Sequence, residues 1–210
     1  MRASQIPFPV KLLDITTYRA QLSTYFPFFP SIRSTLKRLH ISVDCRYDAA
    51  DFSTLVSLIV SNLRHLTFSS IDPRPPIFTL SNYSVVTTGH PIPSEAFRSL
   101  TRLTSLSLTG FHGPSLRLLD TLTQNSPLLV RVSFTNSRWV ADNNRLSTNP
   151  DEIFPTAQIL AVLQRFSRLK GFFPGILPAE DQITYSGFAR VLNARGIATQ
   201  FELCEKEDED

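Results

Sequence analysis

The segments LKRLHISVD (residues 36–44), LRHLTFSSI (63–71) and LTSLSLTGF (103–111) share one pattern, apolar-x-x-apolar-x-apolar. The pattern recurs along the chain, and its copies begin at Val10, Leu36, Leu63, Leu103 and Leu129, with degenerate copies at Leu169 and Ala198. Most steps between copies are about 26 residues, and two steps are longer by about 14 residues. A unit that returns at a nearly constant step predicts a repeat architecture.

Each copy is predicted to be a short strand, because its apolar residues alternate with polar ones. In the second copy, Leu39 and Ile41 belong to one face, and Arg38 and His40 belong to the other. Between the copies, apolar residues recur at helical spacing. This spacing predicts helices over residues 51–62, 115–125, 154–166 and 184–194, and shorter ones over 17–26 (ended by Pro27) and 94–100.

A strand, a helix and a second strand of the same pattern form a crossover unit, whose two strands lie parallel. One such unit cannot bury its apolar face alone, so neighbours must stack. The expected core is therefore shared by all copies: Leu13, Ile15, Leu39, Ile41, Leu66, Phe68, Leu106, Leu108, Val132, Phe134, Phe172, Phe201 and Leu203. A doubly wound sheet is the competing fold, but it favours longer, wholly apolar strands and a glycine-rich first turn.

The three quoted segments resemble the strand segments of leucine-rich repeats, and the resemblance covers nearly the whole chain. It implies an α/β fold, a short leucine-rich-repeat solenoid with parallel strands on the concave face and helices on the convex face. Residues 1–204 would form a single array of about seven repeats. Insertions are expected at residues 72–93 and 136–155, and residues 205–210 (EKEDED) are expected to be an acidic disordered tail.

Within that class, repeats of about 26 residues with well-formed helices resemble the repeat region of fungal F-box proteins. That resemblance implies substrate recognition for a cullin-type ubiquitin ligase. The pattern starts inside a repeat at Val10, and no F-box helix bundle is visible in this chain. We therefore expect contact with a ligase adaptor only if an F-box lies upstream in the full gene product.

Composition excludes several classes of protein. Hydrophobic residues make up 42% of the 210 residues, which is enough to build a core, and no apolar run reaches the length of a membrane span or signal peptide. We therefore expect a cytoplasmic or nuclear location. Cys45 and Cys204 are too few and too far apart for a disulfide framework or a metal site.

The pattern of chemical groups predicts no catalytic, cofactor or metal site, and hence no enzyme. The sequence contains no glycine-flanked nucleophilic serine, no phosphate-binding glycine loop and no paired histidines at helical spacing. The four histidines are scattered: His40, His65, His90 and His112. Exposed histidines on a polar face are the simpler interpretation of His40 and His65.

Aligning the predicted strands stacks their polar residues into columns. Basic residues gather in the N-terminal copies, and hydroxyls recur beside them. Such a face suits an acidic or phosphorylated peptide, because arginine binds carboxylate and phosphate with two hydrogen bonds. The alternative is that these are ordinary solvated strand residues. The candidate partner-binding residues of this face are Lys37, Arg38, His40, Arg64, His65, Thr67, Ser105, Ser107, Arg131 and Ser133.

Both insertions leave the same end of their strands, so they are expected to project from one rim, where repeat proteins often bind partners. Trp139, the only tryptophan, is a further partner-binding candidate if it is exposed. The alternative is that its ring packs onto the array and fixes the loop.

Two functional hypotheses follow. The first is a non-enzymatic protein-interaction scaffold with a protein partner on the concave face and the insertion rim. The second is a binder of anionic partners, either an acidic or phosphorylated peptide or a nucleic acid, through a basic concave face. We expect no membrane partner, and nucleic acid is disfavoured because no basic run is interleaved with aromatic residues.

Overall fold

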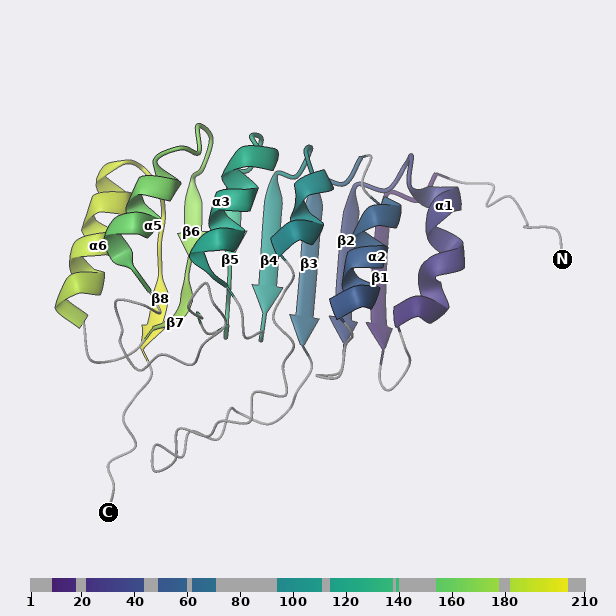
Figure 1. Cartoon of the computed structure of the whole chain (residues 1–210), viewed down its shortest axis with the longest axis horizontal. Helices are drawn as coiled ribbons and strands as arrows, with labels where there is room; N and C mark the ends of the chain where they lie inside the picture. Colours follow the sequence, from purple (N-terminus) through teal and green to yellow (C-terminus); the bar gives the residue numbers. More distant parts are fainter. Residues whose placement is uncertain are drawn as a thin grey trace, which may run out of the picture.

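The computed structural model describes residues 9–17, 22–43, 49–59, 62–70, 94–110, 114–137, 139, 154–177 and 182–203. Six strands form an all-parallel sheet that alternates with helices, and they lie side by side in chain order (Figure 1). The strands are β1 (Leu12–Thr17), β2 (Arg38–Val43), β3 (His65–Ser70), β4 (Ser105–Thr109), β5 (Arg131–Ser133) and β6 (Gly171–Phe173).

The register of the strands agrees with the alignment expected from the repeated pattern. Leu39 pairs with Leu13 on one side and with Leu66 on the other, and the same row continues through Leu106 and Val132. Parallel strands in register place equivalent side chains on the same face. The expected core is therefore confirmed over β2 to β6, where its residues are almost fully buried; Leu13, on the edge strand, is only partly buried.

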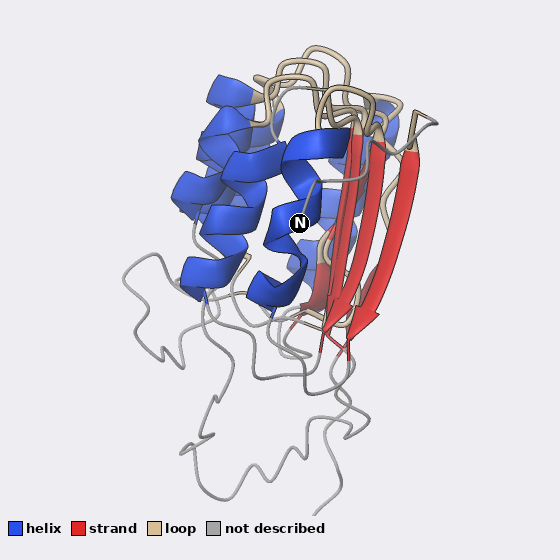
Figure 2. Ribbon diagram, turned by 90° about the vertical axis from the view of Figure 1, so that its right-hand side faces the viewer, coloured by secondary structure: helices blue, strands red, loops and turns tan. Residues whose placement is uncertain are grey.

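The helices cover one face of the sheet and leave the other without a described helix (Figure 2). Their bounds are η1 (Leu22–Phe28), α1 (Phe29–Ile32), α2 (Ala49–Ile59), η2 (Ser94–Ser99), α3 (Leu116–Asn125), α5 (Thr156–Leu163) and α6 (Gln182–Ala194). A doubly wound sheet has helices on both faces and reverses its strand order at a switch point. The single helical layer and the sequential order exclude that alternative.

Local signals account for α3. The hydroxyl of Ser115 accepts a hydrogen bond of 3.2 Å from the backbone N–H of Leu118, which caps the helix N-terminus. Leu118, Leu119 and Leu122 are fully buried, as their spacing predicts. The helices predicted over 51–62, 154–166 and 184–194 are confirmed with shifts of up to three residues at their ends, and the short one over 94–100 is the 3₁₀ helix η2. The one predicted over 17–26 is found as the 3₁₀ helix η1 from Leu22, since Thr17 belongs to β1 and residues 18–21 lie outside the described residues.

Two details of the helix predictions are wrong. Pro27 does not end the first helix, because it lies inside the 3₁₀ helix η1, which continues directly into α1. Proline fits there because its fixed φ of about −65° lies within the range of a 3₁₀ helix. Helical spacing over residues 184–194 places Val191 on one apolar stripe with Phe188 and Leu192, but Val191 is 42% exposed, whereas Phe188, Leu192 and also Tyr185 are buried.

The last predicted strand does not join the main sheet along its length. Ala198 alone pairs with the main sheet, opposite Gly171 of β6: its N–H donates to the carbonyl of Lys170 (2.9 Å), and its carbonyl accepts from the N–H of Phe172 (2.9 Å). The chain then departs, and β8 (Phe201–Leu203) pairs in parallel with β7 (Gly175–Leu177), a strand that the pattern does not predict.

Gly175 makes this departure possible. Its φ of +90° lies in the left-handed region, and a Cβ there would meet the carbonyl oxygen of Phe134 at 2.1 Å and that of Ser137 at 2.7 Å. Only glycine lets the backbone turn from β6 into β7 so close to the segment after β5.

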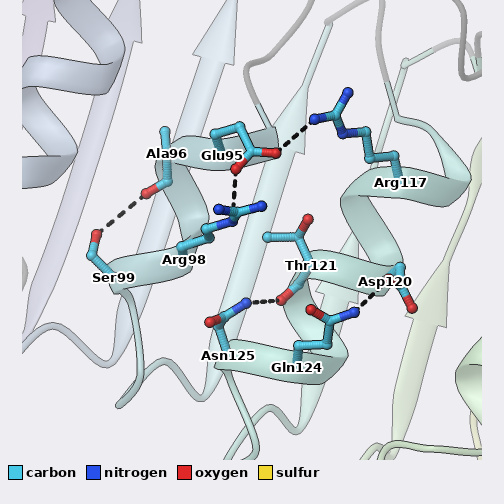
Figure 3. Close-up of polar contacts among 9 residues, drawn as sticks. All are labelled: Glu95, Ala96, Arg98, Ser99, Arg117, Asp120, Thr121, Gln124 and Asn125. Atoms are coloured by element: carbon cyan, nitrogen blue, oxygen red, sulfur yellow. Dashed lines mark hydrogen bonds and ion pairs between the residues drawn. The ribbon is translucent and has the colours of Figure 1, made fainter.

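A polar network joins the helices on the surface of their layer (Figure 3). Glu95 lies 2.6 Å from Arg98 and 2.7 Å from Arg117, so one carboxylate links η2 to α3. Asp120 accepts from Gln124 at 2.6 Å and pairs with Arg165 in the segment after α5. Exposed pairs of this kind contribute little stability, so the network fixes the spacing of the helices more than it holds them together.

Most of the two expected insertions, the acidic tail at 205–210 and both cysteines lie outside the described residues. So do His90 and His112, and the side chain of Leu203 is not described. Among the described residues, no helix is long and apolar enough to cross a membrane.

Candidate functional site

The candidate site is the face of the sheet that carries no described helix, which we call the open face. Its side chains form three rows across the strands, and the hydrogen-bonded register places equivalent residues next to each other. The rows are Leu12–Arg38–His65–Ser105–Arg131, Asp14–His40–Thr67–Ser107–Ser133–Phe173 and Thr16–Ser42–Ser69–Thr109. All but Ser133 are half-buried or exposed, so this face presents hydroxyls and cations to solvent.

A line of cations runs along the N-terminal edge of the strands. The N–H of Lys37 donates to the carbonyl of Lys11 at 2.9 Å, and the N–H of Arg64 donates to that of Lys37 at 2.9 Å. The same step recurs through Thr104 and Val130 to Lys170. Lys11, Lys37 and Arg64 are exposed just before three adjacent strands, and the backbones of each neighbouring pair lie about 4.8 Å apart, within one screening length.

His65 lies beside Arg38 and Arg64, and we call these three residues the basic corner. Partial burial lowers the pKa of His65, and the guanidinium groups of Arg38 and Arg64 lower it further because a second positive charge is unfavourable beside them. His65 is therefore neutral at pH 7. The three side chains together form a position where an anion is stabilised and an added proton is not.

The structure also joins Asp14, His40 and Ser42 in a chain of hydrogen bonds. Nδ1 of His40 lies 3.2 Å from Oδ2 of Asp14, and its Nε2 lies 3.3 Å from the hydroxyl of Ser42. Asp14 is the only carboxylate among the described open-face side chains. It is therefore the one acidic side chain set among the cations of these rows, and His40 orients it.

At the other end of the open face, Arg131 is held against an aromatic ring. Its guanidinium carbon lies 4.6 Å from the centroid of the Phe173 ring on the next strand, a cation–π contact. Gly171, the register partner of Arg131, leaves the space for this arrangement. A Cβ on Gly171 would approach Cε2 of Phe173 to 3.0 Å and Cγ of Arg131 to 3.6 Å.

Two candidates are less accessible than the sequence predicts. Trp139 is only 4% exposed, and its indole N–H donates to the carbonyl of Pro174 at 2.7 Å. Its ring packs edge-on against Phe134 and Phe154, so the exposed partner contact is wrong and the packing alternative is confirmed. Ser133 is 8% exposed, and its hydroxyl shares a hydrogen bond of 2.9 Å with that of Thr135.

Of the other sequence candidates, Lys37 and Arg64 lie just before β2 and β3, at the N-terminal edge of the strands, and the rest belong to the rows of the open face. Thr67, Ser105 and Ser107 are half-buried in the rows between the basic corner and Arg131. Sequence reasoning did not select Ser42, Gly171 or Phe173 as site residues. The predicted rows contain a signal for Phe173, because it is the one aromatic side chain among the hydroxyls and polar groups of its row.

Apart from the open face, a hollow of about 340 Å³ lies beside the edge strand β1 and is lined mainly by apolar side chains of β1, η1 and α1. Small-molecule sites combine such apolar walls with convergent polar groups. The only charged residue in the lining is Asp14, whose carboxylate is paired with His40. The described residues contain no group of three or more His, Cys, Asp or Glu that could hold a metal ion.

No protein-family model matches the chain, and no curated protein has a matching sequence.

Proposed function

We propose that the chain is a leucine-rich-repeat array that serves as a non-enzymatic protein-interaction scaffold and binds its partner on the open face. The observation that carries the proposal is the open face itself: rows of hydroxyls and cations, in register over the strands, on a surface that no described helix covers. A face kept polar and uncovered along several strands is a large surface for a protein ligand.

The fold supports the finer repeat assignment. The first leucine of each full copy after the first, Leu36, Leu63, Leu103 and Leu129, is fully buried, so the repeated positions have the same environment. The second residue of each copy also makes the same backbone step onto the second residue of the preceding copy, from Lys11 through to Lys170. Equivalent residues with equivalent contacts are what a stacked array requires.

Charge supports an anionic partner. Arg38 and Arg64 flank a neutral His65, and Arg131 stands at the far end of the face. Charged groups at an exposed surface steer encounter and select partners more than they add affinity. We therefore infer that an acidic or phosphorylated protein segment is preferred over a neutral one.

The resemblance to fungal F-box proteins extends the proposal to substrate recognition for a cullin-type ubiquitin ligase inside the cell. That extension requires an F-box elsewhere in the gene product. Affinity purification of the full-length product tests it: recovery of a ligase adaptor supports the ligase role. Absence of an adaptor, together with no F-box at the genomic locus, removes that role and leaves the scaffold.

Charge reversal tests the open face directly. The double variant Arg38→Glu/Arg64→Glu is used as bait for partners from the source cells and is titrated with acidic peptides. The matched control is the double variant Arg190→Glu/Arg195→Glu, which makes the same charge change at exposed positions in and just after α6. We expect the open-face variant to lose at least about tenfold in peptide affinity, because it juxtaposes like charges, and the control to bind as the wild type does. Equal binding by all three proteins contradicts the proposal.

A second candidate function, hydrolysis of activated esters, is favoured by one observation, the Ser42–His40–Asp14 chain. In that order a hydroxyl, an imidazole and a carboxylate provide nucleophile, general base and orienting group. His40 is 40% exposed and Asp14 61% exposed, and the ladders on both sides of β2 engage its backbone N–H groups. An oxyanion donor would have to be a neighbouring hydroxyl such as Ser69.

A fluorophosphonate probe distinguishes the two functions. If the chain is a hydrolase, the probe labels Ser42, and both Ser42→Ala and His40→Gln abolish the labelling. We expect no labelling above that of the Ser42→Ala variant, in keeping with a scaffold. Specific labelling of Ser42 would replace the scaffold proposal with the enzymatic one.

A further inference from the structure

We propose that Arg131, stacked on Phe173, is a fixed anion anchor of the open face, and that the face takes an extended peptide segment with two anionic side chains four residues apart. The first anion contacts Arg131 and the second contacts the corner formed by Arg38 and Arg64. This inference rests on the proposed function, and it names the class of partner and its spacing.

The anchor is a built arrangement of three residues. Arg131 and Gly171 are register partners on β5 and β6, and Phe173 follows two residues later on the same face as Gly171. The absent side chain of Gly171 leaves room for the ring, which lies 4.6 Å from the guanidinium carbon of Arg131. An arginine held over a ring in this way has fewer rotamers to lose when it binds.

A held guanidinium suits a carboxylate or a phosphate. Its N–H donors form a planar fork that matches two anionic oxygens at once. The ring of Phe173 offers no oxygen acceptor, so the contact leaves N–H donors of Arg131 available to a ligand. No acid lies in the rows of Arg131 on the described strands β3 to β6.

The register sets the spacing. Arg38, His65, Ser105 and Arg131 occupy one row on four successive strands. Three steps of about 4.8 Å place the two arginine backbones about 14 Å apart. An extended peptide rises about 3.4 Å per residue and alternates its faces, so residues i and i+4 lie about 14 Å apart on the same side.

The groups between the two ends are compatible with a chain that crosses the strands. Ser105 and Ser107 are short hydroxyls that donate and accept hydrogen bonds, and they lie between the basic corner and the anchor. A peptide backbone can therefore pass over β4 without displacing a large side chain.

A peptide fits this face better than a nucleic acid does. Single-stranded nucleic acids bind by stacking successive bases on aromatic side chains along a continuous basic groove. Phe173 is the only aromatic residue in the described rows of the open face, and Arg131 already stacks on it. The cations of the rows stand at two ends of the face and do not track a backbone.

The experiment measures the binding of fluorescent synthetic peptides to the full chain by anisotropy. The probes carry two phosphoserines at i and i+4, two at i and i+2, a single phosphoserine, two glutamates at i and i+4, or unmodified serines. A single-stranded RNA of similar charge is included. The i,i+2 peptide is the matched control, because it has the same charge on the same side at half the distance.

Three variants test the anchor: Arg131→Lys, which keeps the charge, Phe173→Leu, which removes the ring, and Gly171→Ala, which pushes against it. Arg190→Lys on α6 is the matched control. Thermal unfolding of each variant verifies that it folds. We expect the wild type to bind the i,i+4 diphosphopeptide roughly tenfold tighter than the i,i+2 peptide, because only the former engages both ends.

We expect Phe173→Leu to weaken binding of the i,i+4 peptide roughly two- to tenfold, because Arg131 must then be ordered on binding, and Arg131→Lys to weaken it at least as much. Affinities unchanged in all three variants, or equal for the two spacings, overturn the anchor while the scaffold proposal stands. If no peptide binds the wild type, or the RNA binds tighter than every peptide, the result contradicts both the anchor role of Arg131 and the proposal of an anionic protein partner.

Discussion

Replacing Trp139 tests whether its ring holds the C-terminal part of the fold together. The indole lies within an aromatic cluster, edge-on to Phe134 at 5.6 Å, Phe154 at 4.8 Å and Phe172 at 6.4 Å between centroids. Its N–H donates to the buried carbonyl of Pro174. Two substitutions separate these contributions, because Trp139→Phe keeps a ring and loses the donor, whereas Trp139→Ala loses both.

The magnitudes follow from these contacts. Trp139→Phe leaves the Pro174 carbonyl without its donor, which costs about 1–3 kcal/mol of unfolding free energy. Trp139→Ala also removes the ring and leaves a cavity, so we expect about 3–5 kcal/mol. Since whole domains are stable by roughly 5–15 kcal/mol, the alanine variant would lose a large part of the total.

Urea unfolding followed by far-UV circular dichroism measures both values, because the substitutions remove the only tryptophan and with it the main fluorophore. Ile183→Ala on α6 is the matched control: that side chain is 89% exposed, and its removal is expected to change stability by less than about 0.5 kcal/mol. If Trp139→Ala leaves stability within the same range but weakens peptide binding, Trp139 is a partner contact and our account of the cluster is wrong.

Three further outcomes are expected. Burial and two neighbouring arginines lower the pKa of His65, so the unfolded chain binds more protons than the folded one. The wild type therefore loses stability as the pH falls below about 6.5, the ordinary pKa of histidine. His65→Gln removes that loss, which urea unfolding midpoints at about pH 7.5 and about pH 5 would detect. Gly175→Ala prevents folding or lowers stability strongly, because its Cβ meets two backbone carbonyls. Gly187→Ala on α6 has open space around it and raises the unfolding free energy by up to about 1 kcal/mol. Equal effects of the two substitutions in thermal unfolding contradict the strained turn at Gly175. Ser115→Ala removes the cap of α3 and costs about 1 kcal/mol, and a neutral result in urea unfolding contradicts the capping bond to Leu118.

Much of the fold was predictable because its signals are local. Leu39 and Ile41 alternate with polar residues, and Leu118, Leu119 and Leu122 lie on one helical stripe, so periodicity alone assigns their elements. Since all copies share one pattern, aligning them also predicts the register, and with it the rows of the open face. Pro27 and Val191 were mispredicted because a proline in a 3₁₀ segment and an outward valine obey the same local patterns as a helix end and a core residue.

The sequence by itself therefore determined the repeating unit, the parallel order of the strands and the rows of hydroxyls and cations on one face. These depend on the spacing of residues close together in the chain. Only the tertiary structure decided that Trp139 is buried, that β8 leaves the main sheet for β7, and that Arg131 stacks on Phe173. Each of these depends on contacts between distant segments or on the volume left free at a glycine, and side-chain packing, not local periodicity, determines them.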